Sequence, residues 1–273
     1  MTNKYDISLT MPAIRVPNWK NFYKSAEDSC KNHTFELVIA GPFDAVKELK
    51  GYPNVQYIPT KANPSVATQL ANISSKGDLI YNCVDDGVFT NGAIDWVVDY
   101  FKDNCSLKDV VNMRYREAGG GLGNELPSEF WRATTHPELC LPGIHPDWSI
   151  ALHFVMKRDT YITHGGIDCQ FEYSNHGIHD LMFRLQDAGG KVHHSLPEGL
   201  NCNHFMGRSG DHAPIHDAQT QHDSPLFKSI YTDPAAAKNR RMLRLDNWEN
   251  EDEIWGRRDY NEGASTYEDF LSE

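Results

Sequence analysis

The 273-residue chain lacks several features that would assign it at once to a class of protein. Its six cysteines are scattered and include no CxxC pair, which argues against a zinc knuckle and gives no sign of a disulfide framework. No apolar run approaches the ~18 residues of a membrane span, so we expect a cytoplasmic protein without a membrane-spanning segment. Hydrophobic residues at 40% and charged residues at 23% are ordinary for a globular protein, which excludes wholesale disorder.

Negative charge is concentrated at one end of the sequence. The net charge is −12, and the segment 246–273 holds ten acids against two arginines, so the first 245 residues carry only −4. We therefore expect residues 231–273 to form an acidic C-terminal extension that is solvated or weakly ordered. The body of the chain has no basic stripe, which lowers the case for a nucleic-acid partner without removing it.

The glycines do not form a dinucleotide-binding fingerprint, because Asn124 stands where the third glycine of GxGxxG would follow the run Gly119–Gly123. Apolar runs nevertheless alternate with amphipathic stretches, which predicts an α/β fold with a largely parallel sheet and helices on both faces. The predicted strands are 5–11, 35–40, 55–58, 78–84, 109–115, 150–156 and 191–194. The predicted helices are 18–30, 44–49, 65–75 (capped by Ser65), 91–101 and 180–188.

The most informative stretch is 78–87, an apolar strand that runs directly into two adjacent carboxylates, Asp85 and Asp86. The C-terminal end of a buried parallel strand opens onto the ligand crevice of an α/β sheet. Paired carboxylates at such an opening most often hold a divalent metal that carries a phosphorylated ligand. The alternative is a plain strand-end turn, since Asp-Gly is a turn dipeptide in any fold.

The order of several short motifs resembles that of the GT-A glycosyltransferases, in particular the nucleotide-sugar-dependent family 2. The matching segments are the Pro-containing loop 10–17, the strand 54–58 with the helix start at 63–71, the metal element 84–86, the Gly-Gly turn 165–168 and the helix 180–185. The resemblance covers about residues 5–205. It implies a Rossmann-like nucleotide-binding half with a mixed, mainly parallel central sheet, followed by an irregular acceptor half. We expect one such domain over 1–230, divided into a donor-nucleotide half (1–104) and an acceptor and catalytic half (105–230).

The resemblance also implies how a nucleotide-sugar donor is held, with a UDP-sugar favoured. The family's Asp-x-Asp element coordinates the metal on the donor diphosphate, and here Val84 replaces its first Asp while Asp86 matches the second. Asp44 stands near the place of the family's nucleobase-recognising acid, and Arg208 lies in a glycine-flanked loop suited to close over the diphosphate. The expected donor-binding residues are Pro12, Ala13, Arg15, Asp44, Ser65, Asp85, Asp86 and Arg208.

Transfer with inversion requires a base that takes the proton of the acceptor hydroxyl. The Glu-Asp pair that carries this base in the family is absent from the chain. Asp180, expected at the start of a helix, is the first candidate, Glu172 is the reserve, and His179 is a neighbour that would orient or tune Asp180. The alternative role of Asp180 is a helix N-cap.

Histidines are concentrated in the second half, where eleven of the thirteen fall between His145 and His222. Several GT-A enzymes use a histidine C-terminal to the base as an additional metal ligand. His204, or alternatively His212, is expected to join Asp86 in this role. Because neutral imidazole suits Mn²⁺ better than Mg²⁺, we expect the divalent metal to be Mn²⁺ rather than Mg²⁺.

Two other functions stay open. The pairs His179-Asp180, His216-Asp217 and His222-Asp223 are ligand types of a metal-dependent phosphohydrolase, although such motifs normally lie on an all-helical scaffold. The missing Glu-Asp pair also leaves open a non-catalytic nucleotide-sugar binder. The acceptor is unassigned, with a glycan, a small molecule or a modified nucleic acid as the alternatives.

Overall fold

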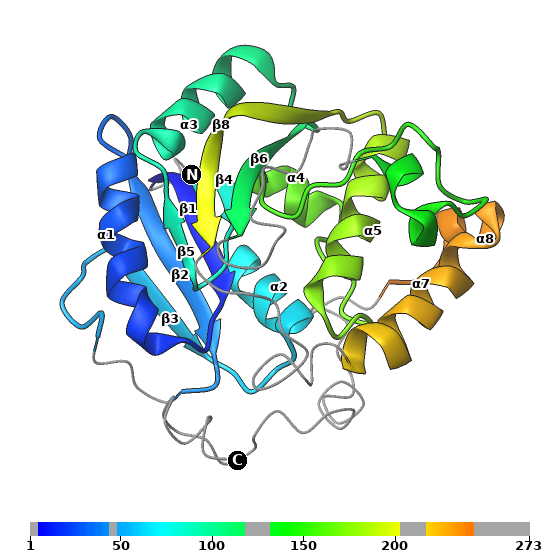
Figure 1. Ribbon diagram of the computed structural model, residues 1–273, viewed down its shortest axis with the longest axis horizontal. Helices are drawn as coiled ribbons and strands as arrows, with labels where there is room; N and C mark the ends of the chain where they lie inside the picture. Colours follow the sequence, from blue (N-terminus) through cyan, green and yellow to red (C-terminus); the bar gives the residue numbers. More distant parts are fainter. Residues whose placement is uncertain (1–4, 44–47, 118–131, 203–216, 243–273) are drawn as a thin grey trace.

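A curled sheet runs through both halves of the molecule (Figure 1). The computed structural model describes residues 5–43, 48–117, 132–202 and 217–242. The strands are β1 (Tyr5–Pro12), β2 (Phe35–Gly41), β3 (Val55–Pro59), β4 (Gly77–Asn82), β5 (Gly87–Phe89), β6 (Val110–Glu117), β7 (Phe154–Lys157) and β8 (Val192–Cys202). The α-helices are α1 (Trp19–Ser29), α2 (Pro64–Ser74), α3 (Ala93–Asn104), α4 (Arg158–Thr163), α5 (Ser174–Asp187), α7 (Ser224–Tyr231) and α8 (Pro234–Asn239). Shorter helical segments are the 3₁₀ turns Val16–Asn18, Ala133–Thr135 and Pro137–Leu139 and the π-helix η6 (Ala218–Asp223).

The strand order is β3-β2-β1-β4-β7-β6-β8-β5. β1 pairs in parallel with β2 and β4, and β2 pairs in parallel with β3, so the first half forms a parallel block. β7 lies antiparallel between β4 and β6, while β6 and β8 run parallel. The expected α/β class with a mixed, mainly parallel sheet is therefore confirmed, and the pairing of β4 with β7 joins the two halves in one sheet.

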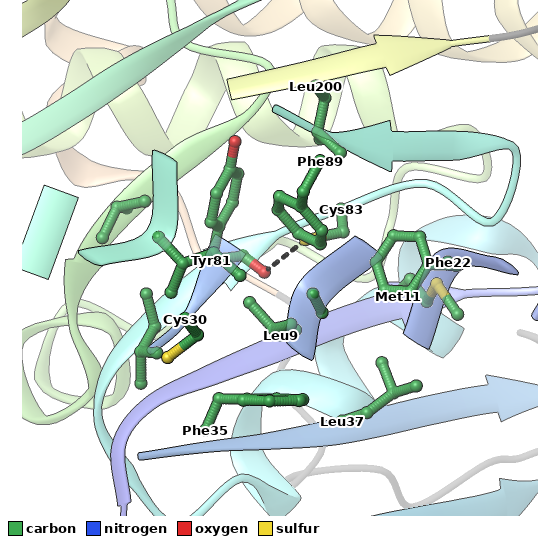
Figure 2. Packing of buried hydrophobic residues seen from close by; sticks show 14 of the residues in the cluster. Leu9, Met11, Phe22, Cys30, Phe35, Leu37, Tyr81, Cys83, Phe89 and Leu200 are labelled. Carbon is green, nitrogen blue, oxygen red and sulfur yellow. Dashed lines mark hydrogen bonds between the residues drawn. The ribbon is translucent and has the colours of Figure 1, made fainter. Parts of the chain in front are cut away.

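The alternation of side chains along β1 lets helices cover both faces of the sheet. The apolar face carries a cluster under α1 and α3 that includes Leu9, Met11, Phe22, Leu37 and Phe89 (Figure 2). The opposite face of β1 is polar and lies under α2, where Thr10 Oγ1 donates to Asn72 Oδ1 (2.5 Å). Ser8 Oγ donates to Glu36 Oε1 (2.6 Å) on the same face, so these buried polar groups are paired as burial requires.

The second half adds a smaller apolar cluster to which both α5 and α7 contribute. These two helices lie side by side (Figure 1). The rings of Phe183 and Phe227 lie 6.3 Å apart, and the ring of Tyr231 lies 5.9 Å from Phe183. The predicted boundary between 230 and 231 falls at the end of α7, and the chain still contacts the body at Arg240, beyond α8. None of the helices in the described residues has the length and apolar character needed to cross a membrane.

Several predicted element boundaries are wrong. Ser65 does not cap α2, because the cap is Asn63, whose Oδ1 accepts a hydrogen bond from the Val66 N–H (3.0 Å). The helix expected to start at Asp180 starts at Ser174. β7 is shorter than the predicted strand 150–156, and β8 continues to Cys202, well past residue 194. Of the predicted helix 44–49, residues 44–47 lie outside the described residues and 48 onward form a turn.

Candidate active site

The carboxyl ends of β1, β2 and β4 bring the loop 13–15 next to the Asp85–Asp86 turn. The Ala13 N–H donates to the Ala40 carbonyl (2.9 Å), and the Cys83 N–H donates to the Thr10 carbonyl (2.8 Å). A Cβ on Gly41 would lie only 2.2 Å from the Ala13 carbonyl oxygen, so this close approach requires glycine. The C-terminal ends of these strands thus fix the positions of Pro12 and Ala13, which the sequence predicts to contact the donor.

Hydrogen bonds to Asp85 connect the loop after β1 to the turn after β4. Its Oδ2 accepts hydrogen bonds from the backbone N–H groups of Ile14 (2.8 Å) and Arg15 (2.6 Å). Its Oδ1 accepts from Nη1 of Arg15 (2.7 Å). The Asp85 side chain is nearly fully buried, and both of its carboxylate oxygens are engaged by the loop.

Asp86 is also buried, and its Oδ2 lies 3.8 Å from the same Nη1 of Arg15. The turn closes with a hydrogen bond from the Gly87 N–H to the Val84 carbonyl (3.3 Å), after which β5 begins. Two carboxylates therefore face one cationic group, a charge pattern that also suits a divalent metal. In the part of the chain that the structure describes, no group of three or more His, Cys, Asp or Glu side chains is arranged so that it could hold a metal ion, and the predicted ligands His204 and His212 lie outside it.

Glu172 lies immediately before α5 and against the first turn of α2. Its carbonyl accepts a hydrogen bond from the Ser65 N–H (3.2 Å), and its own N–H donates to Asp223 Oδ1 (2.9 Å). Nδ1 of His222 lies 3.8 Å from Glu172 Oε1 and 2.8 Å from Asp223 Oδ1. Glu172 is thus a buried carboxylate at the amino end of a helix, with a histidine beside it.

His222 and Asp223 reach Glu172 because they end the π-helix η6, which runs directly into α7. Asp223 is fully buried and also accepts from the Tyr173 N–H (2.7 Å), so it fixes the chain on both sides of the Glu172–Tyr173 bond. π-Helical turns often occur at functional sites. The sequence signals neither the π-helix nor its contact with Glu172, although it does single out His222-Asp223 as a pair.

Asp180 lies inside α5, beyond its first turn, and is fully buried. Its carboxylate accepts hydrogen bonds from Arg184 Nε (2.8 Å) and the Tyr231 hydroxyl (2.7 Å), and it forms an ion pair with Arg240. Burial alone would raise the pKa of the Asp180 carboxyl, but the guanidinium groups of Arg184 and Arg240 outweigh it and hold that pKa below its ordinary value. The expectation that Asp180 starts a helix is wrong, and its contacts favour a structural role.

Arg240 also forms an ion pair with Asp168 of the Gly-Gly turn, so two carboxylates and two guanidinium groups make a neutral buried network. The sequence gives no signal for Arg240, since its partners lie 60 and 72 positions earlier in the chain.

His179 does not turn toward Asp180, because consecutive helical residues point about 100° apart. Its ring lies 5.9 Å from that of His176, and burial together with His176 and His136 lowers the pKa of His179 well below its ordinary value. Of the three predicted His/Asp pairs, His179-Asp180 lies in α5 and His222-Asp223 at the end of η6, and His216 of the third pair lies outside the described residues.

The remaining predicted positions divide into two groups. Ser65 is fully buried in the first turn of α2, next to Glu172. Asp44, Arg208, His204 and His212 lie outside the described residues.

The mixed, mainly parallel sheet with helices on both faces is that of the GT-A fold of the glycosyltransferases. Solved structures of S. aureus TarS, a GT-A family 2 glycosyltransferase, have this fold. One TarS structure aligns with a TM-score of 0.55 and 8% identity over 73% of this chain and 37% of that chain. A structure of TarS 1–349 in complex with UDP aligns with a TM-score of 0.54 and 10% identity over 73% of this chain and 60% of that one.

A further structure of TarS 1–349 aligns over 84% of this chain and 67% of that chain, with a TM-score of 0.54 and 8% identity. The chain therefore spans between about a third and two thirds of the TarS chains that it resembles. No protein-family model and no curated protein matches it by sequence. At this identity the likeness establishes the GT-A fold, and activity must be argued from the residues of the site.

Proposed function

We propose that the protein is a metal-dependent, inverting glycosyltransferase that uses a nucleotide-sugar donor. The observation that carries this proposal is the convergence of the β1 loop on Asp85 and Asp86 at the carboxyl edge of the parallel block. In open α/β sheets this edge is where ligands bind. The UDP complex of TarS, which shares the fold, supports a UDP-sugar as the donor.

We assign the role of base to Glu172 rather than to Asp180. Asp180 is held by two guanidinium groups and a hydroxyl, whereas Glu172 stands at the amino end of α5 beside His222. In the proposed reaction, the acceptor oxygen forms a bond to the anomeric carbon as the bond to the leaving phosphate oxygen breaks. The electron pair of that bond leaves with the nucleoside diphosphate, and the hydroxyl proton passes to the Glu172 carboxylate.

The residues of the acidic turn fit a divalent cation, since they already hold the positive charge of Arg15. Asp86, with His204 or His212, is proposed to hold Mn²⁺ in preference to Mg²⁺. Such a metal supplies Lewis-acid stabilisation of the negative charge that develops on the leaving diphosphate. Arg15 lies at the same place, so this chain contributes a cation of its own to the diphosphate site.

The direct test measures UDP release from a panel of UDP-sugars with Mn²⁺, in the presence of glycan, small-molecule and nucleic-acid acceptors. We expect Glu172→Gln to keep UDP affinity and to lower transfer by about 10²-fold or more, the usual scale for loss of a general base. Asp86→Asn is expected to lose metal-dependent UDP binding. The matched controls are Glu27→Gln and Asp147→Asn, which change exposed carboxylates away from the site.

Each competing function gives a different result in this assay. Release of phosphate from simple esters without any acceptor would contradict the glycosyltransferase function and support a phosphohydrolase. Tight UDP-sugar binding without turnover on any acceptor would identify a non-catalytic binder. Normal transfer by Glu172→Gln would remove Glu172 from the role of base.

A further inference from the structure

Arg15 places one guanidinium group between the two carboxylates of the acidic turn. Its Nη1 lies 2.7 Å from Asp85 Oδ1 and 3.8 Å from Asp86 Oδ2. The side chains of Asp85 and Asp86 are 3% and 2% exposed, and that of Arg15 is 16% exposed. The positive charge of Arg15 therefore lies next to both carboxylates, where it would compete with a divalent metal held by them.

Backbone groups hold the loop to the acidic turn alongside the Arg15 side chain. The N–H groups of Ile14 and Arg15 both donate to Asp85 Oδ2. The Ala13 N–H adds a bond to the Ala40 carbonyl. The guanidinium uses the other oxygen, Oδ1, so its removal takes a positive charge from the turn and leaves these backbone hydrogen bonds in place.

A divalent cation and the guanidinium of Arg15 would both bind the carboxylates of Asp85 and Asp86. Buried carboxylates are stabilised by whichever positive charge is near, and two cations a few ångströms apart in a poorly solvated site repel each other. A metal held by Asp86, with Asp85 beside it, would compete with Nη1 of Arg15 for the negative charge of the two carboxylates. An incoming diphosphate offers the released guanidinium a new anionic partner, which Arg binds well.

We propose that Arg15 is a resident cation that competes with the divalent metal for Asp85 and Asp86 and that passes to the donor diphosphate when the metal binds. The transfer of Arg15 to the donor diphosphate rests on the proposed function, whereas the competition between Arg15 and the metal does not. The metal then binds weakly to the donor-free protein, because it is repelled by the guanidinium of Arg15. It binds tightly together with the nucleotide, because the diphosphate attracts the guanidinium away from the carboxylates. This coupling would keep the site closed to free metal until the donor arrives.

The test measures Mn²⁺ affinity of the full-length protein by the EPR signal of free Mn²⁺, with no nucleotide present. Arg15→Gln is expected to bind Mn²⁺ about tenfold more tightly than the unmodified protein, within the usual scale of coupling between sites. Arg15→Lys, which keeps the charge, is expected to stay close to the unmodified protein. Arg241→Gln, which removes an exposed arginine elsewhere, is the matched control and is expected to leave Mn²⁺ affinity unchanged.

A second titration with UDP present separates competition from the transfer of Arg15 to the diphosphate. UDP is expected to raise Mn²⁺ affinity by a larger factor in the unmodified protein than in Arg15→Gln, because only the former has a guanidinium to relocate. Circular dichroism verifies that the variant is folded, and Arg15→Met, which keeps much of the aliphatic stem, replaces it if it is not.

Equal or weaker Mn²⁺ binding by folded Arg15→Gln would overturn the competition, whatever the activity of the protein. Tighter Mn²⁺ binding without glycosyl transfer on any acceptor would retain the competition and reject the proposed function. An equal UDP effect in both proteins would overturn the transfer of Arg15 to the diphosphate.

Discussion

At the scale of single residues, two carboxylates near α5 have different surroundings. Asp180 is fully buried between Arg184, Arg240 and the Tyr231 hydroxyl, and every one of these groups stabilises its charge. Glu172 lies just before the first turn of α5, with Nδ1 of His222 3.8 Å from its Oε1. The sequence identifies both acids as candidates for the base but does not distinguish between them. The ion pair of Asp180 with Arg240 disfavours Asp180 as the base, and Arg240 lies 60 positions later in the sequence.

We expect Asp180→Asn to lower the free energy of unfolding by about 3 kcal/mol, the scale for breaking a buried ion pair by removing one partner. The substitution leaves the mostly buried guanidinium groups of Arg184 and Arg240 short of one negative charge. Urea denaturation measures the change. Asp187→Asn, at an exposed position of the same helix, is expected to change stability by less than about 0.5 kcal/mol. Equal stability of the two variants would contradict the structural role of Asp180.

His153 makes stability depend on pH. Burial lowers the pKa of His153 to about 4, although Nδ1 contacts the Asn82 carbonyl (3.3 Å), a contact that favours the protonated ring. Between pH 6.5 and 4 the unfolded chain binds a proton at this site that the folded chain does not, so stability falls as the pH falls through this window. One such proton changes the free energy of unfolding by about 1.4 kcal/mol per pH unit.

We expect His153→Gln to remove this part of the slope when the free energy of unfolding is measured from pH 7 to pH 4.5. His145→Gln changes an exposed histidine and is expected to keep the full slope. Identical slopes in His153→Gln and the unmodified protein would show that the folded state protonates His153 normally.

At the scale of elements, the Gly165–Gly166 turn joins α2 to the region before α5. Gly166 has φ +63°, and a Cβ there would lie 2.3 Å from Gln69 Oε1. That oxygen accepts a hydrogen bond from the Ile167 N–H (3.0 Å) and another from the Tyr161 hydroxyl. The turn thus depends on glycine for both its backbone conformation and its contact with Gln69.

We expect Gly166→Ala to lower the free energy of unfolding by about 3 kcal/mol, combining left-handed strain with the loss of the Gln69 contacts. Gly189→Ala is the matched control, since Gly189 also has positive φ (+89°) but nothing lies within 4 Å of its added Cβ. It should show the strain alone, about 1 kcal/mol. Equal losses in thermal or urea unfolding would mean that the contact with Gln69 contributes nothing.

The sequence predicts the first half of the fold better than the second. β1, β2, β3 and β4 are short runs rich in apolar and β-branched residues, and their predicted positions agree with the structure to within two residues. The start of α5 is missed because its N-cap, Tyr173, makes no side-chain cap and because Gly177 interrupts the helical pattern. β8 is underestimated because it contains Pro197 and Gly199, which are uncommon within strands.

At the scale of the whole molecule, the site combines segments that are distant in the sequence. The place of Asp85 and Asp86 just after a buried strand could be predicted from the apolar run before them, and their role in donor binding stays a prediction. The contacts of Asp223 with Glu172 and of Arg240 with Asp168 could not be predicted, since they depend on how η6 and the chain after α8 pack against α5 and the residues before it. Tertiary packing, rather than local pattern, determines these contacts.

The most direct test of the central claim is a thermal-shift titration of UDP with Mn²⁺ on the unmodified protein and on Asp86→Asn. A ligand at about 100 times its dissociation constant stabilises a protein by about 2.7 kcal/mol, which raises Tm by several degrees in a chain of this size. We expect a Mn²⁺-dependent rise with UDP in the unmodified protein and in Asp147→Asn, and no rise in Asp86→Asn. A rise of the same size in Asp86→Asn, or none in the unmodified protein with any nucleoside diphosphate, would contradict a donor site at the turn after β4.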